Sequence, residues 1–111
     1  MTALKPVWYY ILLALAAEDR HGQSIAREVL ELSASQIRLW PATLYGAIEE
    51  LEDRNWIEEL TDARRPPRES QKKRYYRLTR AGRAALASET ERLASVVRIA
   101  RVRVKPRPGN G

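Results

Sequence analysis

The stretch WPATLYGAIEELEDRN, residues 40–55, decides the fold. Proline is tolerated in the first turn of a helix, so Pro41 marks a helix start. The apolar residues after it recur at the i, i+3, i+4, i+7 spacing of one helix face: Leu44, Ala47, Ile48 and Leu51. Asn55 is a residue type that accepts the left-handed conformation in which many helices end. The stretch therefore predicts an amphipathic helix that begins at Pro41 and stops before Asn55.

Two helices are predicted upstream of this one. The segment from Lys5 to Ala17 is apolar almost throughout and predicts a buried first helix. Between Gly22 and Leu32, the apolar residues Ile25, Val29 and Leu32 share one face, which predicts a second, short helix. Residues 33–40 are then the connector between the second and third helices.

Two short strands are predicted downstream, from Trp56 to Thr61 and from Lys73 to Leu78. The segment between them contains Pro66 and Pro67, which exclude regular structure there. The two strands predict a β-hairpin with a long, basic tip. Tyr75 and Tyr76 alternate along the second strand, so we expect one to pack on the core and the other to face DNA or a partner subunit.

The last predicted helix is long. Thr79 is a good N-cap residue, and the helix runs from Arg80 to about Val104, where the following prolines end it. A weak heptad-like seam lies along it and predicts a dimer interface: Leu86, Thr90, Leu93, Val97, Ala100 and Val104. We expect Trp8 of the first helix, with its neighbours Tyr9 and Tyr10, to serve core or interface packing; a small-molecule cavity between subunits is the alternative.

The order helix, helix, helix, strand, basic loop, strand is that of a winged helix-turn-helix. The fold class predicted is mainly α with a small β-hairpin and one long C-terminal dimerisation helix. Residues 1–79 would form the DNA-binding domain, residues 80–105 the dimerisation helix and residues 106–111 a flexible tail. Trp40 is interpreted as a packing anchor and His21, the only histidine, as a turn or capping residue.

The charge is distributed unevenly. The net charge is +6, but residues 41–61 carry one basic and six acidic side chains, whereas residues 62–83 carry nine basic and two acidic ones. A basic block of this kind attracts a phosphate backbone. There is no cysteine, which excludes disulfides and thiolate metal sites. The longest apolar run is too short to span a bilayer, so we expect a cytoplasmic protein.

Three segments in order resemble the PadR family of bacterial transcriptional regulators. They are His21-Gly22 with Ile25 and Val29; Pro41-Ala42-Thr43-Leu44-Tyr45 with Ile48, Leu51 and Trp56-Ile57; and Arg74-Tyr75-Tyr76-Arg77-Leu78-Thr79 with Gly82. The single last helix is similar to the smaller branch of that family. The resemblance implies a homodimeric repressor that binds an inverted-repeat operator and is held together by its C-terminal helix.

Two departures from the family pattern leave the fold intact: Asn55 stands where a glycine is frequent, and Gln23 where an aromatic or aliphatic residue is frequent. Some small members bind flat aromatic drugs in a central pore through a tryptophan on the last helix. No aromatic residue occurs on that helix here, which argues against the same stacking mechanism. Whether any small-molecule effector exists, and what it is, does not follow from the sequence.

The residues predicted to contact DNA belong to the third helix and the wing. They are Pro41, Ala42, Thr43, Tyr45 and Gly46 on the helix, and Arg64, Arg65, Arg68, Lys72, Lys73 and Arg74 on the wing. The second half of the helix carries Glu49, Glu50, Glu52 and Asp53, which phosphate would repel. The helix must therefore enter the major groove with its N-terminal end first.

A protein-interaction module and an enzyme are the two alternative functions. A winged helix can serve as a protein-interaction module, in which the basic wing would bind an acidic partner, and the acidic half of the third helix favours that alternative. An enzyme is not expected, because no nucleophile–base pair, phosphate-binding loop or metal-ligand set is visible, and no cofactor is expected for the same reason. The basic residues at the end of the last helix are interpreted as complementing its dipole.

Overall fold

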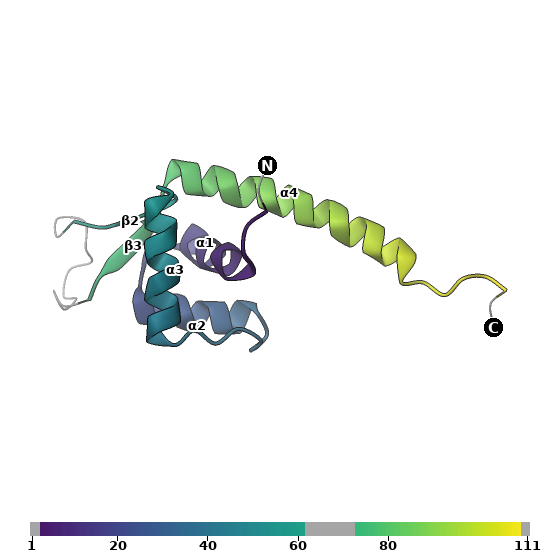
Figure 1. Ribbon diagram of the computed structural model, residues 1–111, viewed down its shortest axis with the longest axis horizontal. Coiled ribbons are helices and arrows are strands. Elements are labelled where there is room, and N and C mark those ends of the chain that lie inside the picture. The colour runs from purple at the N-terminus through teal and green to yellow at the C-terminus, as the bar shows by residue number, and fades with distance from the viewer. Residues whose placement is uncertain (1–2, 62–72, 110–111) are drawn as a thin grey trace.

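The computed structural model describes residues 3–61 and 73–109. In the order of the chain, these residues form α1 (Pro6–Ala17), β1 (Arg20–His21), α2 (Gly22–Leu32), α3 (Pro41–Asp53), β2 (Ile57–Glu59), β3 (Tyr75–Leu78) and α4 (Arg80–Arg103). The predicted fold class is confirmed: the described part is mainly helical with one small sheet (Figure 1). None of its helices is both long and apolar enough to cross a membrane.

The sheet is antiparallel and has the strand order β1-β3-β2. Two strands were predicted, and both are shorter than predicted. β1 was not predicted, because it has only two residues and shows no alternating pattern. His21 of β1 lies opposite Tyr75 of β3, and Arg20 of β1 lies opposite Tyr76 of β3. β3 is therefore the central strand, which joins the start of α2 to the hairpin that follows α3.

Three predicted helix boundaries are confirmed, two by capping contacts and one by its backbone conformation. The Nδ1 atom of His21 accepts a hydrogen bond from the backbone N–H of Ser24 at 3.3 Å, at the start of α2. The hydroxyl of Thr79 accepts one from the N–H of Gly82 at 2.9 Å, at the start of α4. Asn55 has a φ of 62°, so the chain turns there into β2, as the residue type predicted.

The core lies between the helices and the sheet. α1 lies between α2 and α4, and α3 crosses in front of them (Figure 1). The predicted stripe of α3, from Leu44 to Leu51, is buried, and it meets Ile11 and Leu12 of α1 and Ile25 and Val29 of α2. Leu32, predicted to share the face of Ile25 and Val29, is 41% exposed at the last residue of α2.

Two predictions about aromatic residues were wrong. Tyr75 and Tyr76 are both buried, at 6% and 0% exposure, because Tyr76 belongs to the hydrophobic core and the ring of His21 packs against Tyr75. The Tyr75 ring lies edge-on against His21, with 5.4 Å between the ring centroids. Burial raises the pKa of Tyr76 to about 12. Trp40 is not a packing anchor: it is 66% exposed, and the buried position next to it belongs to Leu39.

Candidate DNA-binding surface

The first half of α3 presents small and polar side chains away from the core. Pro41, Ala42, Thr43 and Gly46 are exposed, and Tyr45 is 42% exposed. All five were predicted to contact DNA, and the structure brings them together on the first two turns of one helix. This end of α3 lies beside α2 and away from α4 (Figure 1).

Gly46 leaves open space on the outer face of α3. A Cβ atom added to it would meet nothing within 4 Å, so the glycine is not required by packing or by its backbone conformation. A glycine inside a helix costs about 1 kcal/mol relative to alanine. A position that accepts this cost without a structural reason is suited to the close approach of another molecule.

Tyr45 connects the outer face of α3 to the start of α2 and the base of the wing. Its hydroxyl lies over Gly22, where an added Cβ atom would approach it to 2.3 Å. A concavity of about 290 Å³ lies at this junction, and its lining includes Tyr45, His21, Lys73 and Arg74. The small residue at position 22 thus leaves room for the Tyr45 hydroxyl, and Tyr45 shares the concavity with the two cations.

The base of the wing is less free than the sequence indicated. Lys73 is exposed, but Arg74 forms an ion pair with Glu59, and the hydrogen bond from its guanidinium to that carboxylate raises its pKa. Part of the charge of Arg74 is therefore offset inside the protein. The other predicted wing residues, Arg64, Arg65, Arg68 and Lys72, lie outside the described residues.

The acidic second half of α3 is used by the fold itself. The carboxylate of Glu50 accepts hydrogen bonds from Lys5 Nζ at 3.1 Å and from Trp8 Nε1 at 3.2 Å, and these contacts lower its pKa. Partial burial raises the pKa of Glu52. In the described residues, no group of three or more acidic or histidine side chains could hold a metal ion.

Trp40 and Arg38 form a second exposed feature just before α3, and neither residue was among the predicted DNA contacts. The guanidinium carbon of Arg38 lies 5.7 Å from the centre of the Trp40 ring. Trp40 is the N-cap residue of α3, and its side chain makes no capping hydrogen bond. The signal available in the sequence was a tryptophan at a position where serine, threonine, aspartate or asparagine is usual.

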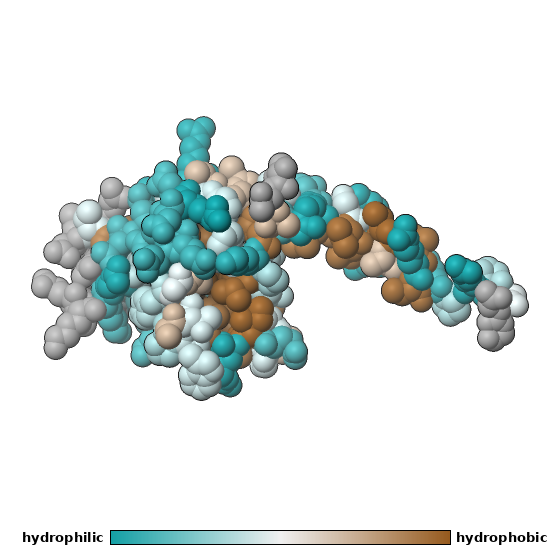
Figure 2. All heavy atoms as spheres, in the orientation of Figure 1, coloured by the Kyte–Doolittle hydropathy of each residue, from teal (hydrophilic) through white to brown (hydrophobic). Residues whose placement is uncertain are grey.

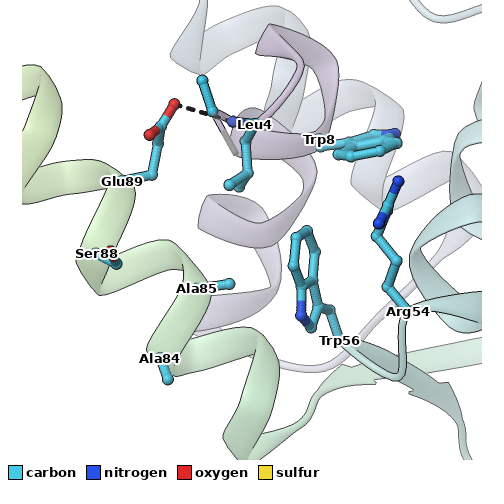
Figure 3. Close-up of a pocket in the computed structure, with 9 residues that line it drawn as sticks. Leu4, Trp8, Arg54, Trp56, Ala84, Ala85, Ser88 and Glu89 are labelled. Carbon is cyan, nitrogen blue, oxygen red and sulfur yellow. Dashed lines mark hydrogen bonds between the residues drawn. The ribbon is translucent and has the colours of Figure 1, made fainter. Parts of the chain in front are cut away.

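A cavity of about 540 Å³ lies between the N-terminal segment, the end of α3 and the first half of α4 (Figure 3). Trp8 and Trp56 meet edge-to-face with 6.0 Å between their ring centroids, and Arg54 lies 4.5 Å from the Trp8 ring. Ala84 and Ala85 of α4 face them across the cavity. Small side chains on α4 thus leave room beside the two indole rings.

Glu89, on the far side of this cavity, is a buried carboxylate that the sequence analysis missed. It is 4% exposed and accepts two hydrogen bonds from Arg92, at 2.6 and 2.7 Å, and one from the N–H of Leu4 at 3.2 Å. The guanidinium of Arg92 lowers its pKa. Glu89 therefore ties the segment before α1 to the middle of α4.

The residues predicted for the dimer interface fall into two groups. Trp8 and Leu86 are 5% and 7% exposed because they pack in the core of the protomer, which leaves them little surface for a partner. The Thr90 hydroxyl is bonded to the Tyr9 hydroxyl at 2.8 Å. Farther along α4, Leu93 is half-buried, whereas Val97, Ala100 and Val104 are exposed.

The exposed part of α4 is more apolar than the predicted seam. Val96, Ile99 and Val102 are also 49%, 51% and 68% exposed, and none of them belonged to the predicted heptad positions. Figure 2 shows these apolar side chains along the half of α4 that extends beyond the body of the molecule. We call residues 93–104, which are the last part of α4 and its C-cap residue Val104, the distal segment of α4.

Together, the fold and the exposed end of α3 define a winged helix-turn-helix protein. Among solved structures, a PadR family transcription regulator from Clostridium difficile matches with a TM-score of 0.74 and 22% identity over 91% of this chain and 100% of that one. A transcriptional regulator from Clostridium thermocellum matches with a TM-score of 0.72 and 23% identity, over 89% and 90%. An uncharacterized protein of Lysinibacillus sphaericus is 29% identical over 93 residues, which are 80% of this chain and 79% of that protein.

The model of the transcriptional regulator PadR-like family matches residues 11–88. The chain therefore belongs to the PadR-like family of transcriptional regulators. The family resemblance drawn from the three sequence segments is confirmed.

Proposed function

We propose that this chain is a homodimeric transcriptional repressor that binds an inverted-repeat operator. The observation that carries the proposal is the N-terminal half of α3: its outer residues are exposed, small or polar, and Tyr45 lines a concavity together with Lys73 and Arg74. An α-helix with small outer side chains fits the major groove, whose base edges distinguish all four base pairs. The helix N-terminus adds a favourable dipole toward phosphate.

In this proposal, Thr43 and Tyr45 are the reading residues. Thr43 can donate and accept a hydrogen bond, and its methyl group can contact a thymine methyl group. Tyr45, which lines the same concavity as Lys73, would bind a phosphate at the edge of the groove. The basic residues of the wing would contact the backbone or the minor groove, where arginine is favoured.

The distal segment of α4 supports the dimer. A stretch of exposed valine and isoleucine residues is unusual on a monomeric soluble protein and marks an interaction site. A second copy of the chain is the proposed occupant, because a two-fold dimer buries the same apolar segment of both copies at once. Two copies of α3 about 34 Å apart would then read half-sites one turn of DNA apart.

The alternative is a protein-interaction module whose basic wing binds an acidic protein. The observation in its favour is that acidic residues 49–53 lie on the same helix as the reading residues. Glu50 accepts hydrogen bonds from Lys5 and Trp8, and Glu52 is partly buried, which weakens that argument. Salt-resistant binding to a protein, with no retention on DNA, would support the alternative.

Fluorescence anisotropy tests the proposal. The probe is a duplex from the DNA upstream of the chain's own gene, and the control is a scrambled duplex of equal length and composition. We expect affinity for the first to be about 10³-fold higher or more at physiological salt, and log affinity to fall linearly with log salt concentration. Sequence-specific repression would be contradicted if the upstream duplex bound no more tightly than the scrambled one and if selection from a random pool enriched no duplex that bound more tightly.

Sedimentation velocity tests the dimer separately. The wild-type chain should sediment as a dimer, and Val97→Asp should shift it to the monomer, because a charge in an apolar interface is not solvated. Val97 is 47% exposed in the protomer, so the variant should still fold. A monomeric wild-type chain that nevertheless binds one half-site would remove the dimer from the proposal.

A further inference from the structure

Trp40 has the most exposed aromatic side chain in the described part of the chain. Two-thirds of it is accessible, whereas Trp8 is 5% exposed and Trp56 is half-buried. Its only ring contact in the described residues is with the guanidinium of Arg38, which is itself exposed. The pair lies immediately before the residues proposed to read DNA, so any molecule that meets the first turn of α3 also meets Trp40.

Trp40 also leaves the start of α3 less stable than a capping residue would. Its φ of −77° and ψ of 156° are those of an N-cap residue, yet its side chain makes no capping bond. Serine at the same position would accept a hydrogen bond from a backbone N–H of the first turn. For the stability of the free protein alone, serine would therefore be the better residue, and tryptophan needs another reason.

We propose that Arg38 and Trp40 form a further DNA contact, which extends the reading surface from α3 onto the connector between α2 and α3. The proposal rests on the DNA binding proposed above. The guanidinium of Arg38 would pair with a phosphate oxygen through its planar set of N–H groups. The indole of Trp40 would lie against the adjacent deoxyribose, with its Nε1–H available to the same phosphodiester.

Charge favours DNA as the occupant of this surface. Residues 33–40 contain one arginine and no acidic side chain, so nothing in the connector repels phosphate. The N-terminus of α3, which Trp40 leaves without a side-chain cap, carries the positive end of the helix dipole next to the pair. An acidic protein surface is the other possible occupant, and it becomes an outcome of the test.

Trp40→Ser separates the two effects of the residue, because stability and affinity should change in opposite directions. We expect the midpoint of thermal unfolding to rise by about 4 °C, since serine caps the helix. The affinity for the operator duplex should fall about tenfold. Trp40→Phe is the matched control: it keeps an aromatic surface and adds no cap, so its unfolding midpoint should stay unchanged and its affinity should fall about threefold or less.

Arg38→Gln tests the phosphate contact through its salt dependence. A lost phosphate contact lowers the magnitude of the slope of log affinity against log salt by about 1. The matched control is Arg83→Gln, which removes the same charge from an exposed position near the start of α4, far from the first turn of α3. Its slope should equal that of the wild-type chain, whereas Trp40→Ser should lower affinity without changing the slope.

Acrylamide quenching reports on the indole directly. Because Trp40 is the most exposed of the three tryptophans, it should dominate quenching of the free chain. Saturating operator duplex should lower the quenching constant about twofold or more in the wild-type chain and leave it nearly unchanged in Trp40→Ser.

Failure of this inference is distinguishable from failure of the proposed function. If the wild-type chain binds no duplex specifically, the proposed function fails, and this inference fails with it. If the wild-type chain binds its operator while Trp40→Ser and Arg38→Gln retain wild-type affinity and slope, only the contact is wrong. Protection of Trp40 from acrylamide by an acidic protein, but not by DNA, would also overturn it.

Discussion

The two ends of α3 differ in how much of their surface the protein uses for itself. At the C-terminal end, Glu50 is bonded to Lys5 and Trp8, Arg54 lies over the Trp8 ring, and Asn55 turns the chain into β2. At the N-terminal end, Ala42, Thr43 and Gly46 are exposed, and Trp40 has no capping contact. Internal contacts hold the C-terminal end, residues 50–55, and we call it the held end of α3. The outer face of the N-terminal end, residues 40–46, is left exposed, and we call this end the open end.

This difference explains how a helix with four acidic residues can serve a DNA-binding fold. Glu50 is hydrogen-bonded to Lys5 and to Trp8 of α1, and Glu52 is partly buried, whereas the small residues at the other end are exposed to solvent on their outer face. Substitutions at the held end should therefore change the stability of the fold, and substitutions at the open end should change binding. Single substitutions at each end of α3 test that separation.

Leu51→Ala should lower the free energy of unfolding by about 2–5 kcal/mol, because Leu51 is fully buried and the substitution leaves a cavity. Chemical denaturation followed by circular dichroism measures this. Thr43→Ala, eight positions earlier and exposed, is the control and should change stability by about 0.5 kcal/mol or less. Similar losses in both variants would mean that the two ends of α3 do not differ as described.

Tyr45→Ala should weaken operator binding about tenfold or more while leaving folding and dimerisation largely intact. Tyr45 is 42% exposed and lies over Gly22 next to Lys73, so it contributes more to the outer surface than to the core. Anisotropy measures the affinity, and thermal unfolding measures the stability. A variant that unfolds would show that Tyr45 is a core residue.

Gly22→Ala tests the position of Tyr45 without altering the tyrosine. The new Cβ atom would lie 2.3 Å from the present place of the Tyr45 hydroxyl, so the end of that side chain must move. We expect an affinity loss smaller than that of Tyr45→Ala, and no further loss when the two substitutions are combined. Additive losses would mean that Gly22 acts on DNA binding independently of Tyr45.

The helices and their ends followed from local patterns in the sequence. The apolar stripe from Leu44 to Leu51, the caps at His21 and Thr79 and the turn at Asn55 each depend on residues within one or two helical turns. Interactions of that range leave a periodic or positional mark in the sequence. The open end of α3 followed as well, because the predicted stripe defines the opposite, exposed face.

Contacts between distant segments left no such mark. β1 has two residues and exists only because β3 pairs with it, so the burial of both Tyr75 and Tyr76 could not be predicted from alternation. The buried Glu89 depends on a hydrogen bond to Leu4, 85 residues away. Trp40 was misplaced for a related reason: an aromatic residue predicts burial on average, and only the packing of Leu39 shows that the buried position was already taken.

Gly46→Ala should make the open end of α3 more stable and less suited to binding. The new methyl group meets no atom within 4 Å, and alanine is the better helix former, so the free energy of unfolding should rise by about 0.5–1 kcal/mol. Operator affinity should fall about threefold or more, because the methyl group lies where the helix approaches DNA. Unchanged affinity would mean that this face of the helix does not come close to DNA.

Glu50→Gln should produce the smallest effect, a loss of stability that depends on pH. Hydrogen bonds from Lys5 and Trp8 hold the pKa of Glu50 below its ordinary value of 4.5 in the folded chain. A carboxyl group with a lowered pKa stabilises the fold above its unfolded pKa, and this contribution is lost as the pH falls through the folded pKa. The difference in unfolding midpoint between the wild-type chain and Glu50→Gln should thus be present near about pH 7 and vanish as the pH falls below the lowered pKa of Glu50.

The size of this effect is limited by solvent, because the Lys5 and Glu50 side chains are 62% and 47% exposed. Glu49→Gln is the matched control: it changes the charge equally at the next position but removes no hydrogen bond in the described part of the chain. Its unfolding midpoint should differ less from that of the wild-type chain at neutral pH. If the two variants behave alike at every pH, the contacts of Glu50 add nothing to stability, and the held end of α3 is held by apolar packing alone.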